Sequence, residues 1–574
     1  MPRFAPLALV LLALPLAAAP VPKGGPAPAW PMFGGTPARN MVSLKEKLPA
    51  LPREGPDWDD EKAAKKWQAE WVLWKVDLGS RAHGGPVVAD GKVYVGTNNA
   101  RPRNTRDTMR DLDGNVCPVD KGVLMCFDEK TGQFLWQAVH DKLVKGGVLD
   151  WPQQGLTSTP AVVGDRVYYV SNQCRVVCVD VNGFTDGNQG VQTEKYQDAT
   201  DADIVWEYDM IRLLGVEPHS ISNGSPLIVG DRLFVQTSNG VGECHVNVPA
   251  PDAPSLICLD RNTGKLLWSD NSPGKNILHG QWSSPTYAEA PVPQVIHGQG
   301  DGWLRAFDPA TGKLLWKFDG NRKGAKYDLG GEGEKSDFVA TPVVHNGRVY
   351  IGTGQDPEHS GGLGNLWCVD LTRAVERGAK SPDRDVSPEL LVRQEKQPDG
   401  GEKAVTTPNP ASALAWVYGG PEKRRWSPGA YKFCRTLSSV AVVDDVVYAA
   451  DVLGYFHCLN ATTGEPFWQY DTKSEIWGSP YFVDGKVLIG NSAGDLFAFK
   501  HTAKPAKFDA IEAAKGAPDR KTAREIYKAE RAKVEREYLL AKIEFPHGIR
   551  TTPTVVNGVL FVTTESTLYA IRKR

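Results

Sequence analysis

The chain has 574 residues, of which 41% are hydrophobic and 23% charged, and its formal net charge is -2 at pH 7. This balance argues against a strongly basic surface for nucleic acid and against an acidic tail for a basic partner, so we expect no nucleic-acid partner. The 58 Gly, 42 Pro and 17 Trp favour short strands and turns over long helices.

Residues 1–19 have the features of a secretory signal peptide, in which one arginine precedes an apolar run of about a dozen residues and several alanines. The run is too short to span a membrane, and no second hydrophobic stretch reaches that length. The cleavage point is left open, because Pro20 would be a poor first residue. We expect an exported protein, soluble in the periplasm or outside the cell, with no transmembrane segment.

After an N-terminal extension at residues 20–70, residues 71–574 repeat one pattern eight times. The pattern begins with a small residue and, in most copies, proline, continues through a Val/Tyr-rich hairpin, and reaches a third run that in most copies ends in Asp or Asn. A Thr-Gly turn and a fourth run with Trp follow, as in DPATGKLLWKFDG from Asp308. Four short runs per copy predict an all-β, eight-bladed β-propeller of four-stranded antiparallel blades.

The eighth copy ends at Arg574, before its fourth run, whereas EWVLWKVDLGS precedes the first copy and has fourth-run character. We expect this N-terminal strand to complete the last blade and to close the ring, which leaves no open edge. The fourth-run tryptophans are expected to dock against neighbouring blades: Trp74, Trp136, Trp206, Trp268, Trp316, Trp416 and Trp468. In the seventh copy, Ala541 stands in place of Trp.

The connections and the nine cysteines need separate explanations. Residues 97–121, 182–203 and 372–413 are polar and are expected to be surface loops, and residues 504–537 have helical spacing that predicts a helical insertion in blade seven. Five cysteines share one third-run position with Ala, which indicates a small buried side chain rather than a cross-link. A disulfide stays open, without a fixed pairing, among Cys117, Cys174, Cys244 and Cys434.

The pattern A-x-D-x-x-T-G-K-x-x-W at Ala306–Trp316 resembles the tryptophan-docking repeat of the quinoprotein, or PQQ-type, propellers. That family includes pyrroloquinoline quinone (PQQ) alcohol dehydrogenases and the BamB-like scaffolds of outer-membrane assembly. WPMFGGTPARN, Trp30 to Asn40, also resembles the opening segment of exported PQQ-repeat proteins. The resemblance covers nearly all of residues 71–574 and implies the fold, but enzymes and scaffolds share it.

In the dehydrogenases, the resemblance implies PQQ on the ring axis between an aromatic plate and a disulfide of two adjacent cysteines, with calcium held by carboxylate and amide oxygens. This sequence has no adjacent cysteine pair and no Cys-x-x-Cys-His haem motif. PQQ with calcium is therefore disfavoured as a cofactor, and we assign no catalytic residue. The Gly-rich stretch Gly352–Asn365 offers Asp356, Glu358 and His359 to a cation, although a turn capped by Asp and Pro explains the same residues.

The segments before the inner strands are expected to meet at one mouth of the central channel, and they supply the candidate ligand site. Its residues are His83, Gln154, Asn223, His279, Gln281, Trp282, Asp337, Arg435, Trp477, His547 and Arg550, with His219 nearby. Convergent polar groups and aromatic rings at a concave mouth are typical of a ligand site. The same side chains would equally serve to hydrate the channel or to satisfy the ends of the inner strands.

The sequence favours a monomeric binding or scaffold protein of the periplasm or cell envelope, with envelope proteins or a small molecule at the channel mouth as partners. The alternative is a quinoprotein-like oxidoreductase or a small-molecule binder that uses the same mouth. No cysteine closely follows the signal peptide, so the chain departs from the lipidated BamB-like scaffold.

Overall fold

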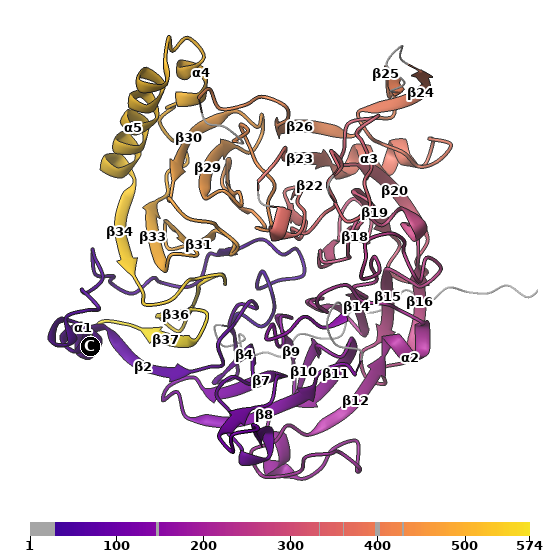
Figure 1. Ribbon diagram of the computed structural model, residues 1–574. Coiled ribbons are helices and arrows are strands. Elements are labelled where there is room, and N and C mark those ends of the chain that lie inside the picture. The colour runs from indigo at the N-terminus through magenta and orange to yellow at the C-terminus, as the bar shows by residue number, and fades with distance from the viewer. Residues whose placement is uncertain (1–28, 145–148, 332, 360, 397–401, 427–429) are drawn as a thin grey trace, which may run out of the picture.

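The computed structural model describes residues 29–144, 149–331, 333–359, 361–396, 402–426 and 430–574, so the expected signal peptide at residues 1–19 lies outside the described residues. Eight antiparallel blades of four strands surround a central axis (Figure 1). The prediction of an eight-bladed all-β propeller is confirmed.

Each blade runs from an inner strand beside the axis to an outer strand at the rim. Blade one contains β3 (Val87–Ala89), β4 (Lys92–Asn98), β7 (Lys121–Asp128) and β8 (Phe134–Asp141), and blade two contains β9 (Ala161–Val163), β10 (Arg166–Val170), β11 (Arg175–Asp180) and β12 (Ile204–Asp209). Blade three contains β13 (Leu227–Val229), β14 (Arg232–Gln236), β15 (Leu256–Asp260) and β16 (Leu266–Asp270), and blade four contains β17 (Thr286–Ala288), β18 (Gln294–Gly298), β19 (Trp303–Phe307) and β20 (Leu314–Asp319). Blade five contains β21 (Val343–His345), β22 (Arg348–Gly352), β23 (Asn365–Asp370) and β26 (Leu414–Gly419), and blade six contains β27 (Ala441–Val443), β28 (Val446–Ala450), β29 (Tyr455–Asn460) and β30 (Pro466–Asp471). Blade seven contains β31 (Tyr481–Val483), β32 (Lys486–Gly490), β33 (Asp495–Lys500) and β34 (Leu539–Glu544), and blade eight contains β35 (Thr554–Val556), β36 (Val559–Thr563), β37 (Thr567–Ile571) and β2 (Val72–Asp77).

The outermost strand of blade eight comes from the other end of the chain, as the sequence predicts. β2 pairs antiparallel with β37, and Trp74 faces Ala570 across the pair. Every other blade repeats this register: a third-strand Cys or Ala faces the fourth-strand Trp, except in blade seven, where Ala498 faces Ala541. A large indole beside the third strand leaves room only for a small side chain opposite it, which explains why Cys and Ala share this position.

The tryptophans lock each blade to the next through one recurring hydrogen bond. The indole Nε1 donates to the carbonyl of the residue that follows the third-strand Asp or Asn of the next blade. The pairs are Trp74 to Glu129 at 3.0 Å, Trp136 to Val181 at 3.0 Å, Trp206 to Arg261 at 3.1 Å, Trp268 to Pro309 at 3.0 Å and Trp416 to Ala461 at 2.9 Å. In most of these pairs, the Thr-Gly turn of the next blade packs against the indole ring of the tryptophan. At Gly312, for example, an added Cβ would lie 2.7 Å from the indole of Trp268.

Two tryptophans depart from this pattern. Trp316 donates to Gln294 Oε1 in its own blade, at 2.8 Å, because the position that supplies the carbonyl elsewhere, Leu371, starts a helix. Trp468 Nε1 is buried without a partner among the described residues, and its ring stacks instead on Tyr538, with 5.2 Å between ring centres.

The N-terminal extension contains a segment that crosses the middle of the ring, seen as the indigo trace in Figure 1. We call residues 30–43 the channel segment. Its backbone exchanges hydrogen bonds with inner strands of successive blades, among them Trp30 with Val88 and Met41 with Phe482, and it ends in the short strand β1 (Val42–Ser43), which pairs parallel with β31. The segment covers the inner strand edges that would otherwise face the channel.

Arg39 anchors the channel segment. It is fully buried, and its guanidinium donates to the carbonyls of Phe33 at 2.7 Å, Pro226 at 2.8 Å, and Pro285 and Ser225 at 3.1 Å. One side chain therefore ties the segment to the inner strands of blades three and four.

Other elements lie outside the blades. The helices are α1 (Glu61–Trp71), α2 (Met210–Leu214), α3 (Leu371–Gly378), α4 (Ala510–Ala514) and α5 (Arg520–Glu537), with 3-10 turns at Thr105–Asp107, Gly183–Asp186, Gly274–Asn276 and Pro357–His359. α4 and α5 lie in the expected insertion and pack outside blade seven, near β30 and β34 (Figure 1). No helix among the described residues is long and apolar enough to cross a membrane.

Two connections expected to be loops contain secondary structure. Residues 97–121 contain a hairpin of β5 (Thr108–Arg110) and β6 (Val116–Pro118). Residues 372–413 contain most of α3 and a hairpin of β24 (Glu389–Lys396) and β25 (Glu402–Pro408). All nine cysteines lie in the described residues and are free. Cys117, Cys174, Cys244 and Cys434, for which a disulfide was left open, therefore form none.

Candidate functional site: the channel mouth

The channel widens into a cavity of about 560 Å³ at the end of the ring where the inner strands begin. All eight blades contribute to its wall, and Phe33 of the channel segment lines it as well. We call this cavity the mouth pocket. Of the eleven predicted mouth residues, six line it: His83, Gln154, Asn223, Trp282, Trp477 and Arg550.

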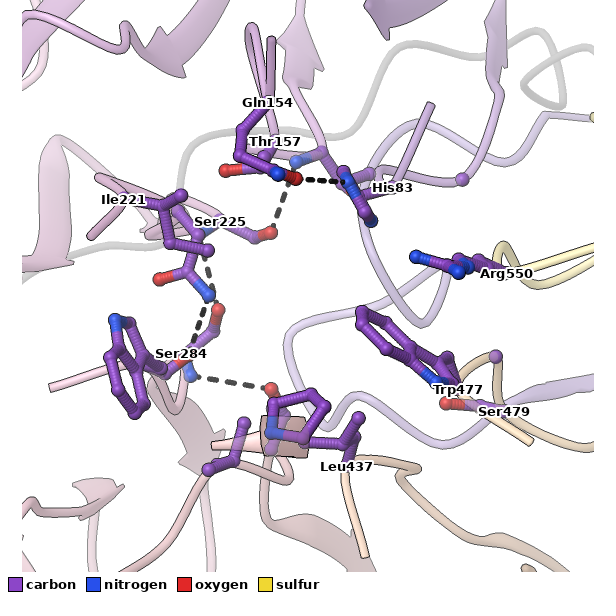
Figure 2. Close-up of a pocket in the computed structure, with 18 of the residues that line it drawn as sticks. His83, Gln154, Thr157, Ile221, Ser225, Ser284, Leu437, Trp477, Ser479 and Arg550 are labelled. Atoms are coloured by element: carbon purple, nitrogen blue, oxygen red, sulfur yellow. Dashed lines mark hydrogen bonds between the residues drawn. The ribbon is translucent and has the colours of Figure 1, made fainter. Parts of the chain in front are cut away.

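One side of the mouth pocket combines positive charge with an aromatic face. The Arg550 guanidinium lies 4.3 Å from the ring centre of Trp477 and forms an ion pair with Glu565 at 3.2 Å. The His83 ring stacks on Trp477 with 5.9 Å between centres, and its Nε2 lies 2.9 Å from Gln154 Oε1 (Figure 2). Burial and the neighbouring guanidinium lower the pKa of His83 to about 4, so the ring is neutral at neutral pH.

The opposite side of the mouth pocket carries an indole and two carboxylates. Trp282 donates from Nε1 to the carbonyl of His219 at 3.4 Å and accepts a bond from Asn223 at its own carbonyl, at 3.3 Å. Asp356 caps the 3-10 turn by accepting from the backbone of Glu358 at 3.0 Å, and burial raises the pKa of its carboxyl. Glu358 is exposed at the rim.

Small hydroxyl residues before the inner strands join neighbouring blades. A backbone N–H of one blade donates to a hydroxyl of the next, from Thr159 to Ser225 at 3.2 Å, Ser225 to Ser284 at 3.1 Å, Ser284 to Thr341 at 3.3 Å, Ser439 to Ser479 at 3.0 Å and Ser479 to Thr552 at 2.9 Å. Figure 2 shows Ser225, Ser284 and Ser479 in this belt. The recurring Ser and Thr therefore satisfy strand ends, whereas the larger side chains remain available to a ligand.

The other predicted mouth residues do not line the pocket. Gln281 is buried behind Trp282, where its amide donates to Ser255 at 2.7 Å. Asp337 is fully buried, neither of its carboxylate oxygens has a partner among the described residues, and burial raises its pKa well above the usual range. Arg435 donates to Ser336 at 3.3 Å.

His279 is also buried behind Trp282, and His547 is exposed away from the pocket. The predicted cation loop enters the mouth, because Asp356 and Glu358 line the pocket. These two carboxylates do not converge with His359 into a ligand set. Among the described residues, the group whose ligand atoms do converge is His219, His245 and His279. Sequence reasoning missed His245, since it lies between the second and third strands of blade three rather than before an inner strand.

Comparison with known proteins identifies the family. A family model described as "Outer membrane protein assembly factor BamB" matches residues 120–389 and 405–507. The chain belongs to this family of PQQ-type propellers.

Individual relatives of this family member fall into two groups. The outer membrane protein assembly factor BamB of Moranella endobia is 21% identical over 415 residues, which cover 71% of this chain and 88% of the relative. The dehydrogenase subunit of the quinone alcohol dehydrogenase of Gluconobacter oxydans is 24% identical over 300 residues, covering 51% of this chain but only 32% of that subunit. The crystal structure of a quinohemoprotein alcohol dehydrogenase from Comamonas testosteroni, at 12% identity, aligns with a TM-score of 0.53 over 95% of this chain and 80% of its own, which shows the fold alone.

The mouth pocket does not reproduce the PQQ site that the family resemblance implies. Trp477 offers one aromatic plate, but all nine cysteines are free and no two are adjacent, so the opposing disulfide cannot form. The guanidinium of Arg550 lies over the face of that plate. We therefore derive no quinone chemistry for this chain.

Proposed function

We propose that the protein is an exported, non-catalytic scaffold of the periplasm or cell envelope, and that its mouth pocket receives a segment of another polypeptide. The observation that supports this most directly is a pocket of about 560 Å³ with Trp477 and Arg550 on one side and Trp282 on the other. Trp and Arg are the residue types that most often dominate the energy of protein–protein interfaces.

The distribution of charge indicates what the segment carries. The charged groups here are Arg81 of blade one and Arg550 of blade eight, since His83 between them is neutral, and Arg550, which also pairs with Glu565, covers part of Trp477. An acidic side chain entering here would pair with the guanidinium, and an adjoining aromatic side chain would stack on an indole. We therefore infer that the bound segment presents an acidic residue next to an aromatic one.

The alternative function is a quinoprotein-like oxidoreductase or a small-molecule binder, which would use the same pocket. Relatives named as dehydrogenases support it, and the pocket volume lies in the range of small-molecule sites. The lack of two adjacent cysteines for the disulfide of the quinone site weighs against the oxidoreductase.

The test is selection from a displayed peptide library on the purified protein, followed by measurement of dissociation constants. We expect enrichment of acidic-aromatic peptides, and a loss of at least tenfold in affinity in both Trp477→Ala and Arg550→Ala. Trp426→Ala is the matched control, because Trp426 is 47% exposed and does not line the pocket. Saturable binding of PQQ with calcium that Trp477→Ala abolishes, without peptide enrichment, would overturn the scaffold in favour of the alternative.

A further inference from the structure

Three histidines converge directly behind the Trp282 side of the mouth pocket. His219 precedes the inner strand of blade three, His245 lies in the loop between β14 and β15, and His279 precedes the inner strand of blade four. The Nε2 atom of His219 lies 2.9 Å from that of His279 and 3.3 Å from that of His245. The ligand nitrogens of all three residues lie within 4.8 Å of one another.

Hydrogen bonding fixes which nitrogen of His219 faces the centre of the group. Its Nδ1 lies 2.8 Å from the carbonyl oxygen of Val241, which can only accept, so Nδ1 carries the hydrogen and Nε2 presents a lone pair. A hydrogen bond from the other ring nitrogen to a carbonyl is typical of metal-ligating histidines.

The spacing of the nitrogens suits a tetrahedral ion. Zinc–nitrogen bonds of about 2.0–2.1 Å place two tetrahedral ligand nitrogens about 3.3 Å apart. The His219–His245 distance of 3.3 Å equals this value, and the His219–His279 distance of 2.9 Å needs a shift of a few tenths of an ångström. Without an ion, the short contact to His279 requires a hydrogen on one of the two Nε2 atoms.

Two buried ring nitrogens at the histidine group lack a hydrogen-bond partner among the described residues. His279 is 1% exposed, and its Nδ1 has no hydrogen-bond partner within the described part of the chain. The ring of His359 lies 5.6 Å from that of His279, and its Nε2 is likewise buried without a partner there. A buried nitrogen without a partner is costly, and it is unusual to find several around one point.

The backbone also holds the rings in place. A Cβ added at Gly240 would lie 2.6 Å from the Cβ of His219, and one at Gly330 would lie 3.0 Å from His245. His245 itself has a φ of 53°, a left-handed conformation that few non-glycine residues adopt. Strained backbone of this kind persists where the surrounding structure fixes it, and it is frequent at binding sites.

We propose that His219, His245 and His279 form a binding site for one divalent transition-metal ion of the zinc type, with the fourth position open to water or to His359. Three imidazoles are a ligand set suited to Zn²⁺, and they are unsuited to Ca²⁺ or Mg²⁺, which prefer oxygen ligands. On binding, the hydrogen between His219 and His279 moves to Nδ1 of His279, so that each ring presents Nε2 to the metal.

The ion would connect blades three and four behind the mouth pocket. The ring centres of His279 and Trp282 are 5.1 Å apart, and the indole of Trp282 donates to the carbonyl of His219. A metal held by these histidines therefore fixes the position of a pocket-lining tryptophan. The site is separate from any quinone site, because its ligands lie behind the wall of the pocket.

The site is tested on the full exported chain, purified without a polyhistidine tag and stripped of metal with a chelator. Titration with Co²⁺ is expected to give one equivalent of bound ion with the intense visible bands of tetrahedral coordination, and Zn²⁺ should displace it. Zn²⁺ should also raise the melting temperature. In His245→Ala the affinity for Co²⁺ should fall by at least about a hundredfold, whereas His547→Ala, which removes an exposed histidine, should bind as the native protein does.

His245 is only partly buried, so its replacement should leave the circular dichroism spectrum and the chelator-treated melting temperature unchanged. His279→Gln provides a second variant with the same expected loss of Co²⁺ binding. The proposal is overturned if the native chain binds less than a tenth of an equivalent, if the bands are those of octahedral Co²⁺, or if His245→Ala retains native affinity. Peptide binding at the mouth pocket is not measured here, so failure of either proposal leaves the other standing.

Discussion

Replacing Arg39 with methionine tests how the channel segment is held. Methionine keeps an apolar stem of similar length but removes the guanidinium, which donates to four carbonyl oxygens, three of them in buried hydrogen bonds. The affected carbonyls belong to the segment itself and to the inner strands of blades three and four. The substitution should therefore weaken the attachment of residues 30–43 without touching the blades' own hydrogen bonds.

The magnitude follows from two opposing terms. Hydrogen bonds from a charged donor contribute about 1.5–3 kcal/mol each, so four contribute about 6–12 kcal/mol. Burial lowers the pKa of Arg39 to about 9, and against an ordinary value of about 12.5 this corresponds to a cost of about 5 kcal/mol. The hydrogen bonds outweigh the burial cost, and we expect Arg39→Met to lose about 4 kcal/mol of local stability.

The assay is native-state hydrogen exchange of the channel segment. If local opening governs exchange, a loss of about 4 kcal/mol accelerates the amides of residues 30–42 by up to about 10³-fold. Arg322→Met is the control, because Arg322 pairs with Glu334 at the surface, with 60% of its side chain exposed, and such pairs contribute about 0.5 kcal/mol. Exchange in Arg39→Met within twofold of the native rate would refute the reasoning.

Three further predictions concern the ring and its insertion. Trp74→Ala should lower the free energy of unfolding by about 3–5 kcal/mol. Deletion of residues 72–77 should lower it further, since β2 is the outer strand of the last blade. An unchanged melting temperature in the deletion variant would contradict closure of the ring by β2. Gly312→Ala should destabilise by about 1–3 kcal/mol more than Gly91→Ala, because both have positive φ but only the added methyl at Gly312 meets an indole, and equal urea midpoints would argue against this packing. Burial raises the pKa of Glu530 on α5 to about 7, so the folded state binds its proton more tightly than the unfolded chain. The free energy of unfolding should therefore fall by about 3 kcal/mol as the pH rises from about 4.5 to 7, and stay level above about pH 7. In urea unfolding, Glu530→Gln should lose this fall in stability. A pH profile of Glu530→Gln that matches the native one would show that Glu530 does not cause the fall.

The ring was predictable because its determinants recur along the chain. Eight copies of one pattern align their small third-strand residues with their tryptophans, and the absence of a fourth run after Ala570 points to Trp74. The departures of Trp316 and Trp468 were not predictable, since the first depends on α3, which lies in an insertion without a repeat, and the second on Tyr538, which lies between α5 and β34.

The path of the channel segment could not be predicted. Its sequence resembles the opening of related proteins, but its position depends on hydrogen bonds to backbone atoms such as those of Val88 and Phe482, which leave no mark on side-chain patterns. The same limitation applies to loops within blades. His245 belongs to the histidine group only because the connection from β14 to β15 folds back toward His219.

The candidate mouth was predictable as a set of segments, but not residue by residue. Every inner strand begins at the same end of the ring, so His83, Trp477 and Arg550 meet there as expected. His83, Trp477 and Arg550 each lie three residues before the proline that opens their copy, whereas His279 lies six and Asp337 five residues before it, and these two side chains are buried away from the pocket.

The most direct test of the account is hydrogen exchange of the protein with and without a peptide selected at the mouth pocket. The account predicts slower exchange at residues 81–85, 220–225 and 475–479, which line the pocket, and no change at the outer hairpin of β24 and β25. Slower exchange confined to that hairpin or to α5, with the pocket segments unchanged, would contradict the claim that the mouth is where the scaffold binds.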